Sequence, residues 1–294
     1  DGNWYSFDIP YSLIASLSGG NPFPDKDGGS KAYMENVFSI LSGGTQGSEL
    51  QFDNVFFFKK INDNQVTTQY VTKSIDSNGA STFDFNHSTN YVLIDVTDNL
   101  KTQMGTNVLK DYRVDDVNNF LYVWENTYNA TSTTGVNSFG EASPYRSFTV
   151  AGNPAWSGLG YISENVGKDL SMIDDSYFLH FAMKGTGAEN YAIEIGNAKF
   201  TIGSAPFNDN GTTIPVLCNY TRDGEWYNID IPVSDLKLFA PSLFNNAGNC
   251  LENVFVALSG GTAGAKLQYD GIFFYKKVST GLNDMNAQNN DKAE

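Results

Sequence analysis

An internal repeat constrains the fold of this chain more than any other feature of its sequence. The stretch MENVFSILSGGTQGSELQFDNVFFFKK (34–60) aligns without gaps with LENVFVALSGGTAGAKLQYDGIFFYKK (251–277), and 17 of the 27 positions are identical. Likewise, DGNWYSFDIP (1–10) returns as DGEWYNIDIP (223–232). We therefore predict that the chain carries two copies of one supersecondary unit.

Each copy has the pattern of β-strands. In the second copy, apolar and polar residues alternate over 226–231, and Pro232 ends the run because proline cannot donate to a ladder. The next residues, VSDLKLF, predict a short helix that begins at Ser234 or Asp235. Two further strands are predicted over 252–258 and 266–277. Three strands cannot bury both of their faces, so the unit must belong to a larger sheet system.

The region between the copies supplies more strands, separated by turns rich in Gly, Asn and Asp. These predicted strands are 90–96, 119–128, 145–150, 157–163, 177–185, 190–203 and 212–220. One short helix is predicted over 98–109, capped by Thr97 or Asp98. We expect roughly eight to ten strands between residues 88 and 278, in an all-β antiparallel β-sandwich of the jelly-roll type.

The same patterns predict the domain organisation. Residues 1–60 are expected to be the C-terminal part of a first sandwich module, 61–87 a linker, 88–278 a complete module and 279–294 a disordered tail. The first copy lacks the strands that precede the second, so we expect a truncated first module whose beginning lies outside this chain. The alternative is that 1–60 docks on the complete module as extra strands.

Composition argues against several classes of function. The formal net charge of −15 opposes binding to nucleic acid or to anionic membranes. No apolar run is long enough to span a membrane. Only two histidines are present, so a His-rich zinc site is not expected. Cys218 and Cys250 could form one bridge or be two small buried hydrophobic residues.

The motifs of common enzyme mechanisms are missing from the sequence. It contains no G-x-S-x-G elbow, no H-E-x-x-H and no phosphate-binding loop. Glu125, Glu194 and Asp230 lie on predicted strands, but their spacing indicates no pair of the kind that a glycosidase uses. We therefore predict a protein that is not an enzyme.

Aromatic residues with polar neighbours are the candidates for sugar binding, because sugar rings stack on Trp and Tyr while their hydroxyls need polar partners. Trp226 shares a strand face with Asn228, but it could instead cover apolar surface, and we favour that structural role. Trp124 at a strand end, Trp156 in a glycine-rich turn, and Tyr161 are further predicted ligand contacts.

Polar residues also gather on one predicted sheet face. Alternation over 177–185 and 190–203 sets His180, Lys184 and Glu194 opposite the apolar side chains of these strands. We expect this shared face either to hold sugar hydroxyls or to be an ordinary solvated surface.

Structural calcium is the one candidate cofactor. Asp115, Asp116 and Asp270 supply hard oxygen ligands of the kind that calcium prefers. The sequence contains no twelve-residue calcium loop, so such a site would have to join strands that are distant in sequence.

The end of the second copy resembles a known family. DGEWYNIDIPVSDL and the strand around Asp270, which Asp53 matches in the first copy, are similar to the closing strands of galactose-binding-like carbohydrate-binding modules. The tandem arrangement resembles surface glycan-binding proteins of Bacteroidota glycan-uptake systems. The tail STGLNDMNAQNNDKAE is similar to the connector before a secretion-sorting domain of that phylum. The resemblance implies a non-catalytic glycan binder built from sandwich modules.

Residues and resemblance together predict a protein that binds a neutral polysaccharide on exposed aromatic and polar side chains. We expect it outside the cell or at the outer-membrane surface, with other glycan-uptake components as partners. Two other classes stay open. The chain could be an accessory module of a secreted glycoside hydrolase, or a structural or adhesive surface protein without a sugar site.

Overall fold

The computed structural model describes residues 51, 55, 70–115, 117–163, 168–244, 250–251 and 253–278. The chain divides into two units, 1–59 and 60–294, and the fold below is that of the second. Apart from residues 51 and 55, the expected first module lies outside the described residues, as does the expected tail from 279 onwards.

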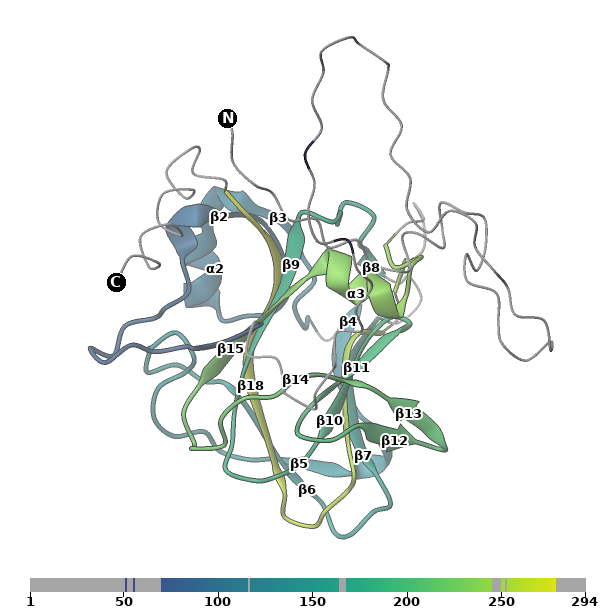
Figure 1. The fold of residues 1–294 in the computed structure, drawn as a ribbon. Helices are drawn as coiled ribbons and strands as arrows, with labels where there is room; N and C mark the ends of the chain where they lie inside the picture. Colours follow the sequence, from purple (N-terminus) through teal and green to yellow (C-terminus); the bar gives the residue numbers. More distant parts are fainter. Residues whose placement is uncertain are drawn as a thin grey trace, which may run out of the picture. The chain divides into compact units, whose positions relative to one another are not determined.

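Two large sheets form the fold (Figure 1). The eight-stranded sheet contains β1 (Val71–Lys73), β2 (Ser88–Asp95), β3 (Val108–Asp111), β5 (Tyr128–Ala130), β6 (Arg146–Val150), β9 (Tyr177–Lys184), β15 (Tyr227–Pro232) and β18 (Lys266–Lys277). The six-stranded sheet contains β4 (Asn119–Val123), β7 (Ser157–Ser163), β10 (Tyr191–Ile195), β11 (Ala198–Ile202), β14 (Val216–Cys218) and β17 (Asn253–Ser259).

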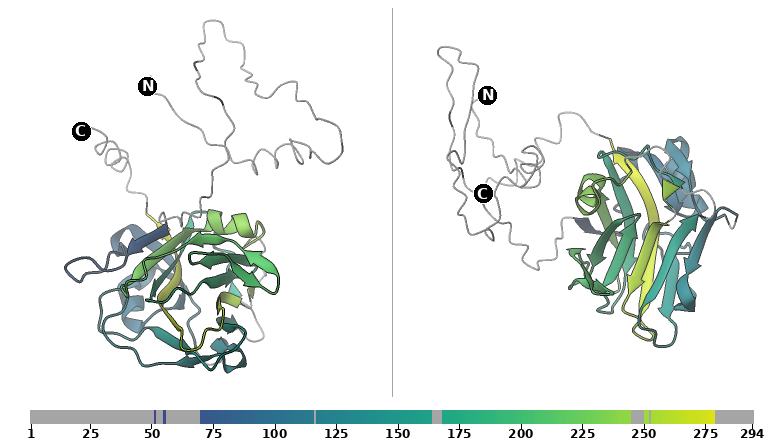
Figure 2. Two further views of the ribbon diagram at one scale, coloured as in Figure 1. Left: turned by 60° about the horizontal axis from the view of Figure 1, so that its bottom comes forward. Right: turned by 90° about the vertical axis from the view of Figure 1, so that its right-hand side faces the viewer.

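Two short ribbons complete the strands: β12 (Phe207–Asp209) with β13 (Thr212–Ile214), and β8 (Lys168–Asp169) with β16 (Cys250–Leu251). Within the described ranges, only β2 with β3 and β11 with β14 pair in parallel. The predicted all-β antiparallel sandwich is therefore confirmed, and Figure 2 shows it from two further sides.

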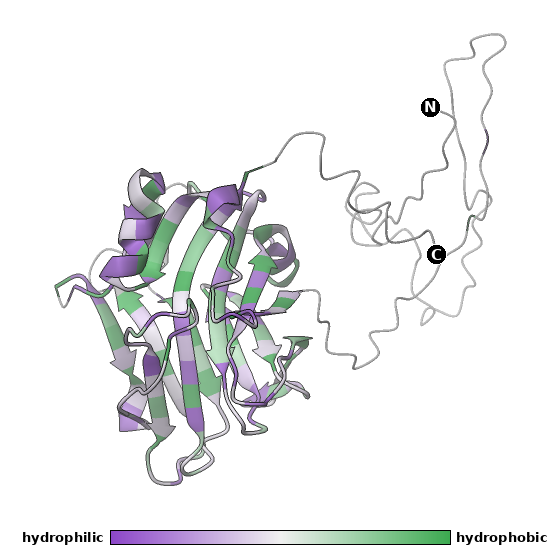
Figure 3. Ribbon diagram, turned by 90° about the vertical axis from the view of Figure 1, so that its left-hand side faces the viewer, coloured by the Kyte–Doolittle hydropathy of each residue, from purple (hydrophilic) through white to green (hydrophobic). Residues whose placement is uncertain are grey.

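The main core lies between the two sheets, and Figure 3 shows hydrophobic residues recurring along their strands. Phe181 of β9 meets Phe255 of β17 across this core, with ring centroids 5.3 Å apart. Tyr269 of β18, the strand next to β9, also packs on Phe255, at a centroid distance of 6.2 Å. These contacts hold the sheets face to face, as in other sandwiches.

A second apolar cluster covers the outer face of the eight-stranded sheet. It includes Phe83, Tyr91, Phe139 and Phe273, and helix α2 (Asp98–Met104) adds Leu100 and Met104. As predicted, Thr97 caps this helix, because its side chain accepts from the backbone N–H of Leu100. The described ranges contain three short 3₁₀ turns: η3 (Phe85–His87), η4 (Gly105–Asn107) and η5 (Trp124–Asn126).

The predicted linker is partly wrong. Residues 70–87 belong to the sandwich, since Val71 of β1 pairs with Ile229 of β15 and Phe83 is buried. Polar composition misled the prediction here, because an edge strand needs few apolar residues.

The structure also has more and shorter strands than expected, with β2 to β18 between residues 88 and 277. Pro215 separates β13 from β14, and a turn at Gly196 separates β10 from β11. Helix α3 (Val233–Phe239) begins one residue before the predicted Ser234, with Pro232 as its N-cap. Cys218 is a free buried thiol. None of the helices in the described ranges is long and apolar enough to cross a membrane.

Candidate functional site

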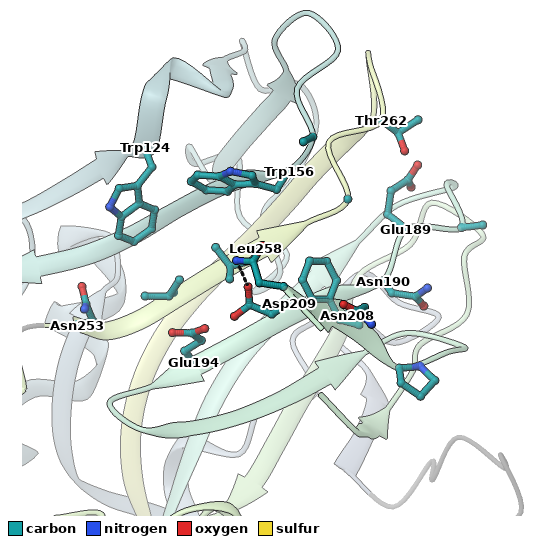
Figure 4. Close-up of a pocket in the computed structure, with 17 residues that line it drawn as sticks. Trp124, Trp156, Glu189, Asn190, Glu194, Asn208, Asp209, Asn253, Leu258 and Thr262 are labelled. Atoms are coloured by element: carbon teal, nitrogen blue, oxygen red, sulfur yellow. Dashed lines mark hydrogen bonds between the residues drawn. The ribbon is translucent and has the colours of Figure 1, made fainter. Parts of the chain in front are cut away.

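A pocket of about 870 Å³ lies over the outer face of the six-stranded sheet (Figure 4). Its lining comes from the turn after β4, the loop before β7, strands β10 and β17, and the β12–β13 ribbon. Figure 4 shows Trp124 and Trp156 next to each other, across Leu258 from Asn208 and Asp209. We call this space the groove.

Two glycines of β7 leave the space that the indole rings of Trp124 and Trp156 occupy. A Cβ atom on Gly160 would lie 2.5 Å from Cη2 of Trp124, and one on Gly158 would lie 2.7 Å from Cζ3 of Trp156. Real Cβ atoms do not approach other atoms so closely, so each indole occupies space that a side chain of β7 would fill. The pattern Gly-Leu-Gly therefore lets both rings lie against bare backbone on the same face of the sheet.

An unusual turn sets the place of Trp124. The predicted strand 119–128 ends at Val123, and the next residues, Glu125 and Asn126, adopt left-handed backbone angles with φ of 51° and 52°. Such conformations are uncommon outside glycine and are often found at functional sites. Thr127 fixes the turn to β7, because its Oγ1 donates to the Trp124 carbonyl at 2.8 Å and accepts from the Gly158 amide at 3.1 Å.

The repeated Ser-Gly-Gly sequence sets the place of Trp156. Gly261 has a φ of 73°, and a Cβ atom there would lie 2.9 Å from the backbone nitrogen of Trp156 and closer still to the Pro154 carbonyl oxygen. Only glycine permits this approach of the two loops. A motif shared by both copies of the repeat thus supports a groove residue in the second copy.

The opposite wall of the groove is polar. The β12–β13 ribbon carries Asn208 and Asp209, and Glu194 of β10 stands on the sheet beneath them. A single register row runs across the sheet through Tyr122, Gly160, Val256, Glu194 and Lys199. Lys199 Nζ lies 2.6 Å from Glu194 Oε1 and 3.5 Å from Asp209 Oδ2. Indole rings thus face carboxylate and amide groups across an apolar floor.

Three of the predicted ligand contacts line this groove: Trp124, Trp156 and Glu194. Trp226 and Asn228 do not, because Asn228 is buried on β15 of the other sheet and Trp226 is buried immediately before that strand. Trp226 Nε1 donates to the Val136 carbonyl at 3.0 Å, and Asn228 donates to Thr82 Oγ1 at 3.2 Å. These contacts give Trp226 the structural role that the sequence favoured.

Tyr161 is also misplaced by the sequence prediction. Its side chain is 2% exposed, its hydroxyl donates to Asp95, and it lies 3.0 Å from the Tyr269 hydroxyl. It alternates with Gly158 and Gly160 along β7, so it points into the core while the glycines face the groove. A ring in this position offers no surface to a ligand.

The expected polar face of His180, Lys184 and Glu194 does not exist. The first two lie on β9 of the eight-stranded sheet, whereas Glu194 lies on β10 of the six-stranded sheet. His180 is fully buried, with Nδ1 2.9 Å from Asp230 Oδ1. Lys184 donates to the Tyr145 hydroxyl. The prediction fails because β9 and β10 follow one another along the chain but belong to different sheets.

The calcium candidates do not come together as a metal site. Asp115 closes its own turn, because its carboxylate accepts hydrogen bonds from the backbone amides of Val117, Asn118 and Asn119. These bonds, those from Asn118 and Asn119 first, lower the pKa of Asp115 to about 2. Asp270 is buried and accepts from the amide and hydroxyl of Ser138. Asp116 lies outside the described residues. Among the described residues, no three His, Cys, Asp or Glu side chains gather where they could hold a metal ion.

Asp270 gives the sandwich a predictable response to pH. Burial raises the pKa of Asp270 from 3.8 to about 6, against the hydrogen bonds from Ser138. The folded protein therefore holds this proton more tightly than the unfolded chain does. Stability should fall as pH rises from about 4 to about 6, by at most about 3 kcal/mol, and stay lower above that range. Asp111, Asp115 and Asp174, with pKa values lowered to about 2, titrate below this window.

Asp270→Asn tests this response, because asparagine keeps an acceptor for Ser138 and cannot ionise. We expect the variant to match the wild type near pH ~4 and to have the higher free energy of unfolding near pH ~7. Urea melts across that range measure the difference. A variant that is no more stable than the wild type at the upper end would contradict the assignment.

Sequence reasoning missed most of the polar wall and the floor. Asn208, Asp209, Val256 and Leu258 carry no local sign of their role, since a ribbon and a strand from distant parts of the chain meet here. The alternating glycines 158 and 160, beside a tryptophan-bearing loop, were a usable signal. Glycine weakens a strand interior and often marks the close approach of another group.

Comparisons with known proteins give distant likenesses of fold. A family 30 carbohydrate-binding module is 16% identical, over 53% of this chain and 77% of that chain, with a TM-score of 0.34. The family 11 carbohydrate-binding module of the cellulosomal cellulase Lic26A-Cel5E of Clostridium thermocellum is 14% identical, over 66% and 98% of the two chains, with a TM-score of 0.32. A mutant of the family 29 module CBM29-2 is 11% identical, over 67% and 99%, with a TM-score of 0.30.

No family model matches the chain, and no curated protein matches it either. None of the three structures above is named as part of a Bacteroidota glycan-uptake system. Likenesses this distant say nothing about the ligand of this chain.

Proposed function

We propose that the groove binds a neutral polysaccharide without cleaving it. The observation that carries this proposal is the pair of indole rings seated on Gly158 and Gly160, opposite a wall of amide and carboxylate groups. Sugar rings have apolar faces that pack on aromatic rings, while their hydroxyls need hydrogen-bond partners at the edge. The groove offers both surfaces at once, with Val256 and Leu258 as an apolar floor between them.

Charge supports a neutral ligand. Glu189, Glu194 and Asp209 line the groove, and Lys199 is ion-paired to two of them. A polymer of uronic acid or sulfated sugar would bring more negative charge into this space, which the net charge of −15 further disfavours.

The same carboxylates support binding rather than hydrolysis. A glycosidase needs one protonated and one ionised carboxyl group about a glycosidic bond. Here Glu194 and Asp209 share one lysine ammonium, at 2.6 and 3.5 Å. We place this binding outside the cell or at the outer-membrane surface, beside other glycan-uptake components, on the strength of the sequence resemblance alone.

Affinity electrophoresis tests the function. The chain is run through gels that contain a neutral glucan, mannan, fructan or xylan, with polygalacturonate as the acidic comparison. We expect retardation by at least one neutral polymer and none by polygalacturonate, with no release of reducing sugar on incubation. Free migration through every neutral polymer would exclude polysaccharide binding.

Gly160→Ala should weaken that binding while the sandwich stays folded. The backbone of Gly160 does not need a left-handed conformation, but the new Cβ would lie 2.5 Å from Trp124 and 3.0 Å from Cγ2 of Val256. The indole must therefore lift off the strand, and we expect about a tenfold loss of affinity, or about 1.4 kcal/mol. Gly185→Ala, at the end of β9 in the other sheet, is the matched control. Equal retardation of both variants would contradict the proposal that Trp124 must lie against Gly160 to bind the polymer.

A further inference from the structure

The polar wall of the groove is a ribbon that stands apart from the six-stranded sheet. Strands β12 and β13 pair only with each other within the described chain, from Phe207 opposite Ile214 to Asp209 opposite Thr212. The turn between them is Asn210-Gly211, with φ of 48° and 89°, as expected for a tight hairpin. A free-standing two-stranded ribbon is marginally stable in water, so its position depends on how it is attached.

One attachment lies at the base of the ribbon. The hydroxyl of Thr201, on β11, accepts from the Phe207 amide at 3.1 Å and donates to the Ile214 carbonyl at 2.8 Å. Thr201 is fully buried, so this base is firm. These two hydrogen bonds fix the position of the hairpin base, but the angle of its tip depends on contacts closer to the tip.

The second attachment lies next to the tip. Glu194 and Lys199 are directly opposite each other on β10 and β11, and Lys199 extends from this pair to Asp209. Burial lowers the pKa of Lys199, but the hydrogen bond and charge of Glu194, with those of Asp209, outweigh it and leave the pKa raised. Lysine therefore stays charged between two carboxylates, one on the floor and one on the wall.

We infer that Lys199 is a positioning residue that holds the β12–β13 ribbon at its distance from Trp124 and Trp156, and so sets which sugar chains fit the groove. The identity of the ligand rests on the proposed function, but the attachment of the ribbon through Lys199 does not. Without the ammonium, the carboxylate of Glu194 on the floor repels that of Asp209 on the wall above it, and the ribbon swings away from the tryptophans.

Hydrogen exchange of the free, full chain tests the attachment without any ligand. In Lys199→Met, we expect amides of residues 207–214 to exchange roughly fivefold faster, as for loss of a moderate ion pair, while amides of β17 are unchanged. Lys199→Arg should exchange like the wild type, because arginine keeps the charge. Lys266→Met, at an exposed lysine of β18, is the matched control. Equal protection of the ribbon in Lys199→Met and wild type would overturn the inference.

A double-mutant cycle adds specificity. In the Asp209→Asn background, Lys199→Met should speed exchange of the ribbon far less than it does in the wild type, because the partner on the wall has lost its charge. An undiminished effect in that background would show that Lys199 does not act on the ribbon through Asp209, and would overturn the inference.

Binding provides the last measurement. For a polymer that retards the wild type, Lys199→Met should lower the affinity by roughly fivefold, with Lys199→Arg restoring most of it. If the wild type is retarded by no polymer, the proposed function fails, while hydrogen exchange still decides the attachment. If the wild type binds but the ribbon is equally protected in Lys199→Met, the attachment fails and the proposed function stands.

Discussion

Alanine at Trp124 or at Trp156 is expected to reduce retardation by the polysaccharide to near that of a gel without polymer. Each indole lines the groove and rests on a glycine of β7, so its removal takes away stacking surface and opens the floor. Tryptophans that are buried on binding often contribute about 2 kcal/mol or more, which is roughly a thirtyfold change in the dissociation constant. Both rings are partly exposed in the free protein, so the variants should melt within a few degrees of the wild type.

Trp226→Phe is the matched control for the two groove tryptophans. Trp226 is buried, and its hydrogen bond to the Val136 carbonyl is lost in this variant, at a cost of about 1–3 kcal/mol in stability. The affinity of this variant for the polymer should not change, because Trp226 lies beside the other sheet, immediately before β15. Undiminished binding in both Trp124→Ala and Trp156→Ala, or lost binding in Trp226→Phe with its fold intact, would move the site away from the groove.

The fold was largely predictable because its signal is local. Alternation with a period of two gave β2, β9 and β17 nearly to the residue, and Thr97 marked the start of α2. The pairing of strands was not predictable, because it depends on contacts between residues far apart in sequence. His180 and Glu194 show the consequence, since strands that are adjacent in sequence lie in different sheets.

The site was predictable only where the chain marks it locally. Trp124 and Trp156 stand out because a tryptophan at a strand end or in a loop has little core to cover. Tyr161 resembles them in the sequence, yet one step along β7 turns a side chain from the groove to the core. The contact between Asp209 and Lys199 was not predictable, because it forms only where the β12–β13 ribbon brings Asp209 to Lys199.

Asp95→Ala should destabilise this sandwich strongly. Asp95 of β2 accepts from Nε and Nη2 of Arg146 at 2.8 and 2.9 Å, and the Tyr161 hydroxyl donates to the same carboxylate. Burial raises the pKa of Tyr161 well above its ordinary value, so it remains a donor, and Tyr269 lies 3.0 Å from its oxygen. Tyr161 belongs to the six-stranded sheet and the other three to the eight-stranded sheet, so this cluster joins the two layers.

Removing the carboxylate leaves a guanidinium and a buried hydroxyl without their acceptor. Breaking a buried pair in this way typically costs about 3–5 kcal/mol, and the partial exposure of Arg146 favours the lower end. For a domain of this size, Tm should fall by about 10 °C. Asp175→Ala is the control, because Asp175 is well exposed and its ion pair with Lys237 should contribute less than about 1 kcal/mol. Thermal melts that place both variants within about 2 °C of the wild type would show that apolar packing alone joins the sheets.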